Sequence, residues 1–140
     1  PWMYPEMVPQ VRQALALRYR LMPYLYTQMW RASRDGIPAV RPLLYDFPQD
    51  ATAVKTDDAF MLGPDVLVAP VLEEGATQRS VYLPAHPGGW YDGHDGRHFA
   101  GGKLATVAAP LGRLPLFLRA GALIPLGDAT GIGAEREVVA

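Results

Sequence analysis

The 140-residue sequence contains no cysteine, so disulfide bonds and cysteine-ligated metal sites are excluded and the redox compartment stays open. An excess of one charge is also lacking: 13 basic and 14 acidic residues leave a net charge of −1, and no basic face for nucleic acid stands out. The longest apolar stretch, Val11 to Trp30, contains Arg12, Arg18 and Arg20, which disfavours a membrane span.

The N-terminus also lacks a basic segment followed by an apolar core, as a secretory signal would have. We therefore predict no nucleic-acid partner and no membrane partner. The compartment is not fixed, although a cytoplasmic protein is favoured over a secreted one. No cofactor is predicted, because the glycines at 88–89 and 101–102 do not lie between a strand and a helix as a phosphate cradle requires.

A long amphipathic helix is predicted from Gln10 to about Arg34. Its apolar residues recur at spacings of three, four and seven, which gives one apolar stripe. Pro23 removes one hydrogen bond and is expected to kink this helix near Tyr19. Gly36 suits the left-handed cap that ends it.

A strand is predicted over residues 37–47, directly after this helix. Helix, short loop and buried strand follow the alternation of an α/β protein. Arg41 lies among apolar residues here and must find a partner if it is buried, with structural pairing favoured over a substrate contact.

The segment 48–58 is predicted to be a polar loop. It carries Asp50, Asp57 and Asp58, which together raise the question of a calcium site. The spacing lacks the twelve-residue calcium-loop pattern with its terminal glutamate, so a solvated loop is preferred.

The apolar stretch from Phe60 to Leu72 divides the chain, because helical patterns precede it and only strand and turn patterns follow. Its length and composition predict a strand buried on both faces. Pro70 cannot donate to a sheet ladder, so a bulge or a switch between sheets is expected there.

Short strands separated by turn residues are predicted for the rest of the chain, which favours an antiparallel sandwich. The glycine-rich segment 93–102 is expected to form a hairpin loop. The predicted strands are 79–83, 90–92, 103–109, 116–120, 123–126 and a last edge strand at 135–140.

The cluster that most resembles a site lies at this hairpin. Histidine and aspartate at such spacing could ligate a metal, but the spacing is not the helical His-Glu-x-x-His pattern. A plain surface turn is therefore preferred over a metal site and over a contact at the rim of a sugar site, and no metal site is assigned. The residues concerned are His86, Asp92, His94, Asp95 and His98.

No convincing active site emerges from the residues alone. The sequence has no nucleophile elbow and no plausible Ser-His-Asp set. A pair of carboxylates for acid–base catalysis cannot be singled out either, although Asp46, Asp50, Asp57 and Asp92 are the carboxylates to revisit if the chain proved active. No substrate-binding residue is assigned.

Four blocks of the sequence form a recognisable series. In order they are LRYRLMPYLYTQMWRASRDGIPAVRPLLYDFPQD, DDAFMLGPDVLVAPVLEEGATQRSVYLP, GGWYDG and APLGRLPLFLRAGALIP. These blocks closely resemble glycoside hydrolase family 31, which contains α-glucosidases and α-xylosidases, and the resemblance covers about residues 1–126. One departure follows the Trp-Tyr-Asp motif, where the family usually has an aromatic residue and this sequence has Gly93-His94.

The resemblance implies a mixed fold, with the end of a (β/α)8 barrel followed by an all-β antiparallel sandwich. On that basis residues 1–58 are expected to hold a late barrel helix and the last barrel strand, and residues 59–140 the proximal C-terminal domain. The loop 48–58 would then lie at the C-terminal end of that strand, at the rim of the active site.

The resemblance also implies a retaining α-glycosidase that removes terminal α-linked sugars from oligosaccharides or glycosides. Both catalytic aspartates of the family, the nucleophile and the acid/base, are expected upstream of Pro1, so no catalytic residue is assigned and this chain alone is expected to be inactive. Its part would be to support the barrel, and its exposed barrel-facing surface would favour self-association.

Two alternatives remain at this point. The sandwich could bind carbohydrate through Tyr82, Trp90 and Tyr91, because aromatic faces stack on sugars. It could also be a purely structural domain of a protein that has lost catalysis.

Overall fold

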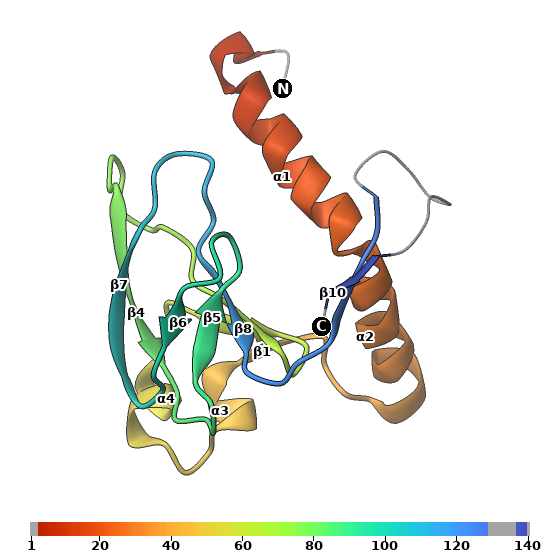
Figure 1. Cartoon of the computed structure of the whole chain (residues 1–140), viewed down its shortest axis with the longest axis vertical. Coiled ribbons are helices and arrows are strands. Elements are labelled where there is room, and N and C mark those ends of the chain that lie inside the picture. Colours follow the sequence, from red (N-terminus) through yellow and green to blue (C-terminus); the bar gives the residue numbers. More distant parts are fainter. Residues whose placement is uncertain (1–2, 129–136, 140) are drawn as a thin grey trace. The chain divides into compact units, whose positions relative to one another are not determined.

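The computed structural model describes residues 3–128 and 137–139 (Figure 1). The chain forms two compact units, one from Pro1–Ile37 with Leu123–Ala140 and the other from Pro38–Ala122. The domain boundary that the family resemblance implies, after residue 58, stays a prediction. None of the helices within the described ranges is long and apolar enough to cross a membrane.

The first unit begins with a 3-10 turn, η1 (Pro5–Met7), and two α-helices, α1 (Val8–Arg20) and α2 (Met22–Asp35). The predicted helix is divided at Leu21, close to the predicted kink, although the N–H of Leu21 still donates to the carbonyl of Leu17 at 3.0 Å. Pro23 lies in the first turn of α2, where its missing N–H needs no partner. Gly36 ends α2 in the left-handed conformation as predicted, at φ +69°.

A two-stranded antiparallel ribbon completes this unit, formed by β9 (Ile124–Leu126) and β10 (Glu137–Val139). Strand β9 packs on α2, and the N–H of Gly127 donates to the carbonyl of Arg20, at 2.7 Å. The break between α1 and α2 thus leaves the Arg20 carbonyl able to accept a hydrogen bond from the C-terminal segment. The strand predicted at 123–126 is confirmed, and the one predicted at 135–140 is confirmed in its described part.

The second unit contains a six-stranded sheet and a two-stranded ribbon, and all of their strand pairs are antiparallel. The antiparallel fold predicted for this part of the chain is therefore confirmed. The sheet has the order β1 (Val40–Pro42), β2 (Phe60–Leu62), β3 (Val66–Val68), β8 (Leu116–Arg119), β5 (Trp90–Asp92) and β6 (His98–Phe99), and the ribbon pairs β4 (Gln78–Leu83) with β7 (Lys103–Ala108).

The strand predicted over 37–47 is shorter than expected. Only β1 is extended, and a helical turn, α3 (Leu43–Asp46), follows it. Pro42 cannot donate to a ladder, and the Arg41 guanidinium closes the turn by a two-pronged ion pair with Asp46. Strand β1 pairs antiparallel with β2, whereas a barrel strand has parallel neighbours, so β1 extends the antiparallel sheet.

The apolar stretch 60–72 forms a hairpin of β2 and β3 rather than one strand. The turn between them begins at Gly63, whose φ of +60° favours glycine. Strand β3 is buried on both faces, as predicted for the stretch as a whole. The chain leaves this sheet before Pro70 and enters the ribbon at β4, which agrees with the expected switch between sheets.

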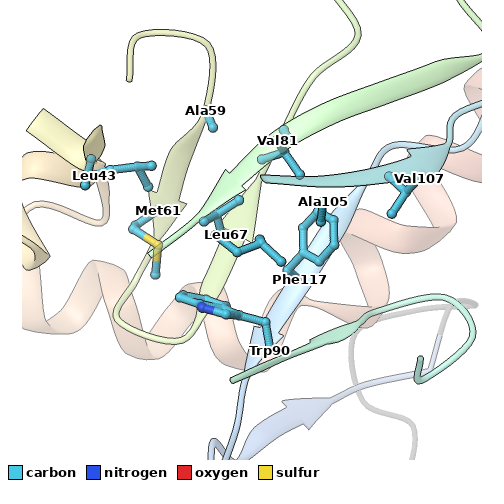
Figure 2. Close-up of a cluster of buried hydrophobic side chains, with 12 residues drawn as sticks. Leu43, Ala59, Met61, Leu67, Val81, Trp90, Ala105, Val107 and Phe117 are labelled. Carbon is cyan, nitrogen blue, oxygen red and sulfur yellow. The ribbon is translucent and has the colours of Figure 1, made fainter. Parts of the chain in front are cut away.

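The core of the second unit lies between the sheet and the ribbon (Figure 2). Leu67 and Phe117 project from the sheet, and Val81 and Val107 from the ribbon; all four are buried. The Phe117 ring meets the edge of Phe99, with centroids 5.7 Å apart. Burial of these apolar side chains stabilises the packing of the sheet on the ribbon.

Replacing Phe117 by alanine tests this core. We expect Phe117→Ala to lower the free energy of unfolding by about 3–5 kcal/mol, because it removes a fully buried ring and leaves a cavity. Urea denaturation measures the effect. Leu111→Ala, at an exposed position, is the control and should change stability by less than about 0.5 kcal/mol; equal effects of the two variants would contradict this assignment of the core.

Candidate functional site

A groove of about 360 Å³ lies on the second unit, formed by β1, the segment 56–60 and the chain at Pro70 and Leu72. Its walls are largely apolar. Val40 and Leu72 expose 56 % and 67 % of their surfaces, which is high for aliphatic side chains. A concave, mostly apolar site with a few polar groups is the usual form of a binding site.

The charged groups of this groove are paired within the fold, with one exception. Arg41 is nearly buried, binds the carboxylate of Asp46 at 2.7 and 2.8 Å, and so has the structural partner that its position required. Asp58 forms an ion pair of 2.7 Å with Arg79. Asp57 is exposed, and no hydrogen bond or ion pair to its carboxylate occurs within residues 3–128 and 137–139.

The loop predicted at 48–58 contains a short helix, α4 (Ala51–Lys55), that the sequence analysis missed. Asp50 caps it, because its carboxylate accepts from the N–H groups of Thr52 and Ala53 at 3.0 and 3.1 Å. The signal was present, since an aspartate directly precedes the good helix formers Ala51 and Ala53.

The same Asp50 carboxylate also accepts a hydrogen bond of 2.7 Å from the Tyr82 hydroxyl, which joins α4 to β4. Burial acts to raise the pKa of Asp50, but this bond and the amide N–H groups outweigh it and lower the pKa below its ordinary value of 3.8. Burial and the neighbouring carboxylate raise the pKa of Tyr82. Asp50 is therefore an anchor that stays ionised, which is the opposite of a general acid.

The hairpin cluster proposed from sequence is a surface turn held together by its own side chains. The buried Asp92 carboxylate accepts from the His94 N–H at 2.8 Å and from Arg113 at 3.1 Å. Arg113 also contacts Asp95 at 3.2 Å. The Arg97 N–H and Arg113 lower the pKa of Asp95.

The three histidines are not brought together as ligands. His94 and His98 each contact a backbone carbonyl through Nε2, those of Leu114 and Gly88, both at 2.7 Å. His86 lies against the Trp90 ring instead, with centroids 6.2 Å apart. No group of three or more histidines, aspartates and glutamates suited to a metal occurs in the described part of the chain.

The aromatic residues considered for sugar stacking are mostly engaged elsewhere. Trp90 is fully buried, and its Nε1–H donates to the carbonyl of Pro84 at 2.8 Å, so neither ring face can meet a ligand. Tyr82 is bound to Asp50. Tyr91 alone of the three is well exposed, at 41 %, and its ring lies 5.1 Å from that of His98.

The second unit is an antiparallel β-domain in which Asp46, Asp58 and Asp92 are paired with arginines. The family description "Glycosyl hydrolase family 31 C-terminal domain" matches residues 36–124. The chain therefore belongs to glycoside hydrolase family 31. The match begins before β1, which agrees with the assignment of β1 to the antiparallel sheet.

Similar proteins include a probable glucan 1,3-alpha-glucosidase from Arabidopsis thaliana, 43 % identical over 91 % of this chain and 14 % of the relative. An alpha-xylosidase from Saccharolobus solfataricus is 36 % identical over 90 % of this chain and 17 % of the relative. The chain thus spans about a seventh of the length of the curated relatives that it matches.

Solved structures give the same result. The family 31 dextranase of Flavobacterium johnsoniae, complexed with isomaltotriose, matches with a TM-score of 0.75 at 40 % identity, over 79 % of this chain and 13 % of that one. The cycloalternan-forming enzyme of Listeria monocytogenes, in complex with a pentasaccharide substrate, matches with a TM-score of 0.82 at 36 % identity, over 87 % and 11 %.

Removing the Tyr82 hydroxyl tests the anchoring role of Asp50. Tyr82→Phe should lower the free energy of unfolding by about 1–2 kcal/mol at neutral pH, because it removes a hydrogen bond to a carboxylate. The pKa of Asp50 is lower in the folded state than in the unfolded state. The contribution of Asp50 to the free energy of unfolding is therefore complete above the unfolded pKa of about 3.9 and is lost as the pH falls through the folded pKa.

The variant should therefore lose less stability than the wild type between about pH 5 and pH 2, which urea titrations at several pH values measure. Tyr26→Phe removes an exposed hydroxyl in the first unit and is the matched control. Parallel stability curves for wild type and Tyr82→Phe across this pH range would contradict the anchoring role.

Proposed function

We propose that this chain is the C-terminal part of a longer retaining α-glycosidase that removes terminal α-linked sugars from oligosaccharides or glycosides. In this proposal residues 1–35 belong to the end of a (β/α)8 barrel, and the antiparallel unit supports that barrel. The nucleophile and the acid/base lie in the protein that precedes this chain.

The observation that carries the proposal is the combination of family membership with the small share of each relative that the chain covers. The relatives named α-glucosidase or α-xylosidase are aligned over about nine-tenths of this chain and about a seventh of their own length. Their names give the reaction class, the hydrolysis of α-linked glucosides and xylosides. An α-linked oligosaccharide or glycoside is therefore the proposed substrate.

The roles of the carboxylates support this division of labour. A retaining glycosidase needs two carboxyl groups about 5 Å apart that are free to act on the scissile bond. Asp46 instead binds an arginine, and Asp50 caps a helix and binds a tyrosine hydroxyl. Asp92 stabilises a hairpin turn. Changing them should affect stability rather than the chemical step.

The alternative of a carbohydrate-binding module has less support than it had from the sequence. It relied on three aromatic residues, and the burial of Trp90 and the bond from Tyr82 to Asp50 leave Tyr91 as the exposed ring.

The proposal is tested with the longer protein and the 140-residue chain, assayed on p-nitrophenyl α-glucoside and α-xyloside. We expect hydrolysis by the longer protein and none by the chain. In the longer protein, Asp50→Asn should leave kcat within about twofold at temperatures well below unfolding, because Asp50 is an anchor and not an acid or base. A loss of about 10³-fold or more with an unchanged unfolding midpoint would overturn the assignment.

Self-association of the isolated chain is a second expectation. Apolar side chains on its helices are exposed, which leaves surface that the proposed barrel would cover. Analytical ultracentrifugation should show oligomers whose population rises with concentration; a monomer across the whole range would contradict the proposal. The exposed residues are Leu15, Tyr26, Met29 and Trp30.

A further inference from the structure

The groove at β1 combines exposed apolar walls with one uncompensated carboxylate. Its walls include the well-exposed aliphatic side chains of Val40 and Leu72, together with Pro42, Phe60 and Pro70. Contiguous exposed apolar surface rimmed by polar groups is typical of a contact with another macromolecule.

The charged residues that line the groove indicate which side chain the other macromolecule should present. Arg41 and Asp58 are neutralised by Asp46 and Arg79 within the fold, at 2.7 Å each. The Asp57 carboxylate remains as the uncompensated charge among the residues that line the groove, most of which are apolar. A lysine or arginine matches both features, because its aliphatic stem packs on apolar surface while its cationic end meets a carboxylate.

A carbohydrate fits this groove less well. Sugars stack on exposed aromatic faces, whereas the lining here is mainly proline and aliphatic residues, with Phe60 partly buried. The groove therefore favours a protein segment over an oligosaccharide.

We infer that this groove receives a segment of the longer protein outside residues 1–140, in which a lysine or arginine lies among apolar residues and pairs with Asp57. The inference rests on the proposed function, since that proposal assigns most of the protein to a part beyond this chain. It adds a specific interdomain contact that anchors the β-domain through one ion pair surrounded by apolar surface.

Thiol labelling in the longer protein tests the inference. Residues 1–140 contain no cysteine, so Leu72→Cys and Leu111→Cys introduce unique thiols into this region. The wild-type side chains are 67 % and 74 % exposed in this chain, so the two thiols should react with N-ethylmaleimide at similar rates unless one is covered. We expect the thiol at position 72 to react at least about tenfold more slowly, because labelling then requires local opening.

The role of Asp57 is tested in the same background. Adding Asp57→Lys to Leu72→Cys should raise the labelling rate to within about twofold of the Leu111→Cys rate, because like charges repel the segment. Adding Glu74→Lys, a charge reversal at an exposed residue that does not line the groove, should leave labelling slow. Peptide mass spectrometry assigns each modified thiol.

The inference would be overturned by equal rates at positions 72 and 111, or by slow labelling that Asp57→Lys does not relieve. Protection at position 72 that increases with protein concentration would indicate a second copy and would overturn it as well. Protection that requires added isomaltotriose would assign the groove to sugar and also overturn it. Hydrolysis of p-nitrophenyl α-glucoside by the same samples separates the two proposals. An active protein with equal labelling rates would refute the groove contact alone.

Discussion

One row of buried side chains across the six-stranded sheet is the constraint on which the second unit depends. Strand register places Arg41 opposite Met61, Met61 opposite Leu67, Leu67 opposite Phe117, and Phe117 opposite Asp92. The middle of the row is apolar and fully buried, and each end is a buried charge. A one-residue slip of any strand would turn this row to the opposite face, so the row fixes the register of five strands together.

The two charged ends of that row show a structural role for two aspartates of the chain, Asp46 and Asp92. Arg41 is matched by Asp46 in the next helical turn, and Asp92 by Arg113 before β8. Loss of either partner would leave a buried charge uncompensated, which typically costs about 3–5 kcal/mol. Both carboxylates are thus engaged within the fold, which is consistent with the proposal that the chemistry lies elsewhere in the protein.

The sequence predicted most of the strands after residue 78 and the antiparallel arrangement, because short apolar runs between turn residues are a local signal. It failed where specific pairings decide. The strand predicted at 37–47 is cut short by a local ion pair between Arg41 and Asp46, and the division of 60–72 depends on β3 pairing with both β2 and the distant β8. Asp50 and Asp57 were treated alike as loop carboxylates, yet one is bound to Tyr82 and the other lines a groove.

These two aspartates, seven residues apart, differ in the contacts that are open to them: Asp50 is bonded within the domain, and Asp57 is available to a partner outside it. Asp50 accepts hydrogen bonds from α4 and β4, and these bonds fix the loop 48–58. The loop also carries Asp57, which lines the groove together with the exposed side chains of Val40 and Leu72. Water solvates the exposed Asp57 carboxylate in this chain, so Asp57 adds stability only in the proposed contact, where a cationic side chain pairs with it beside apolar surface.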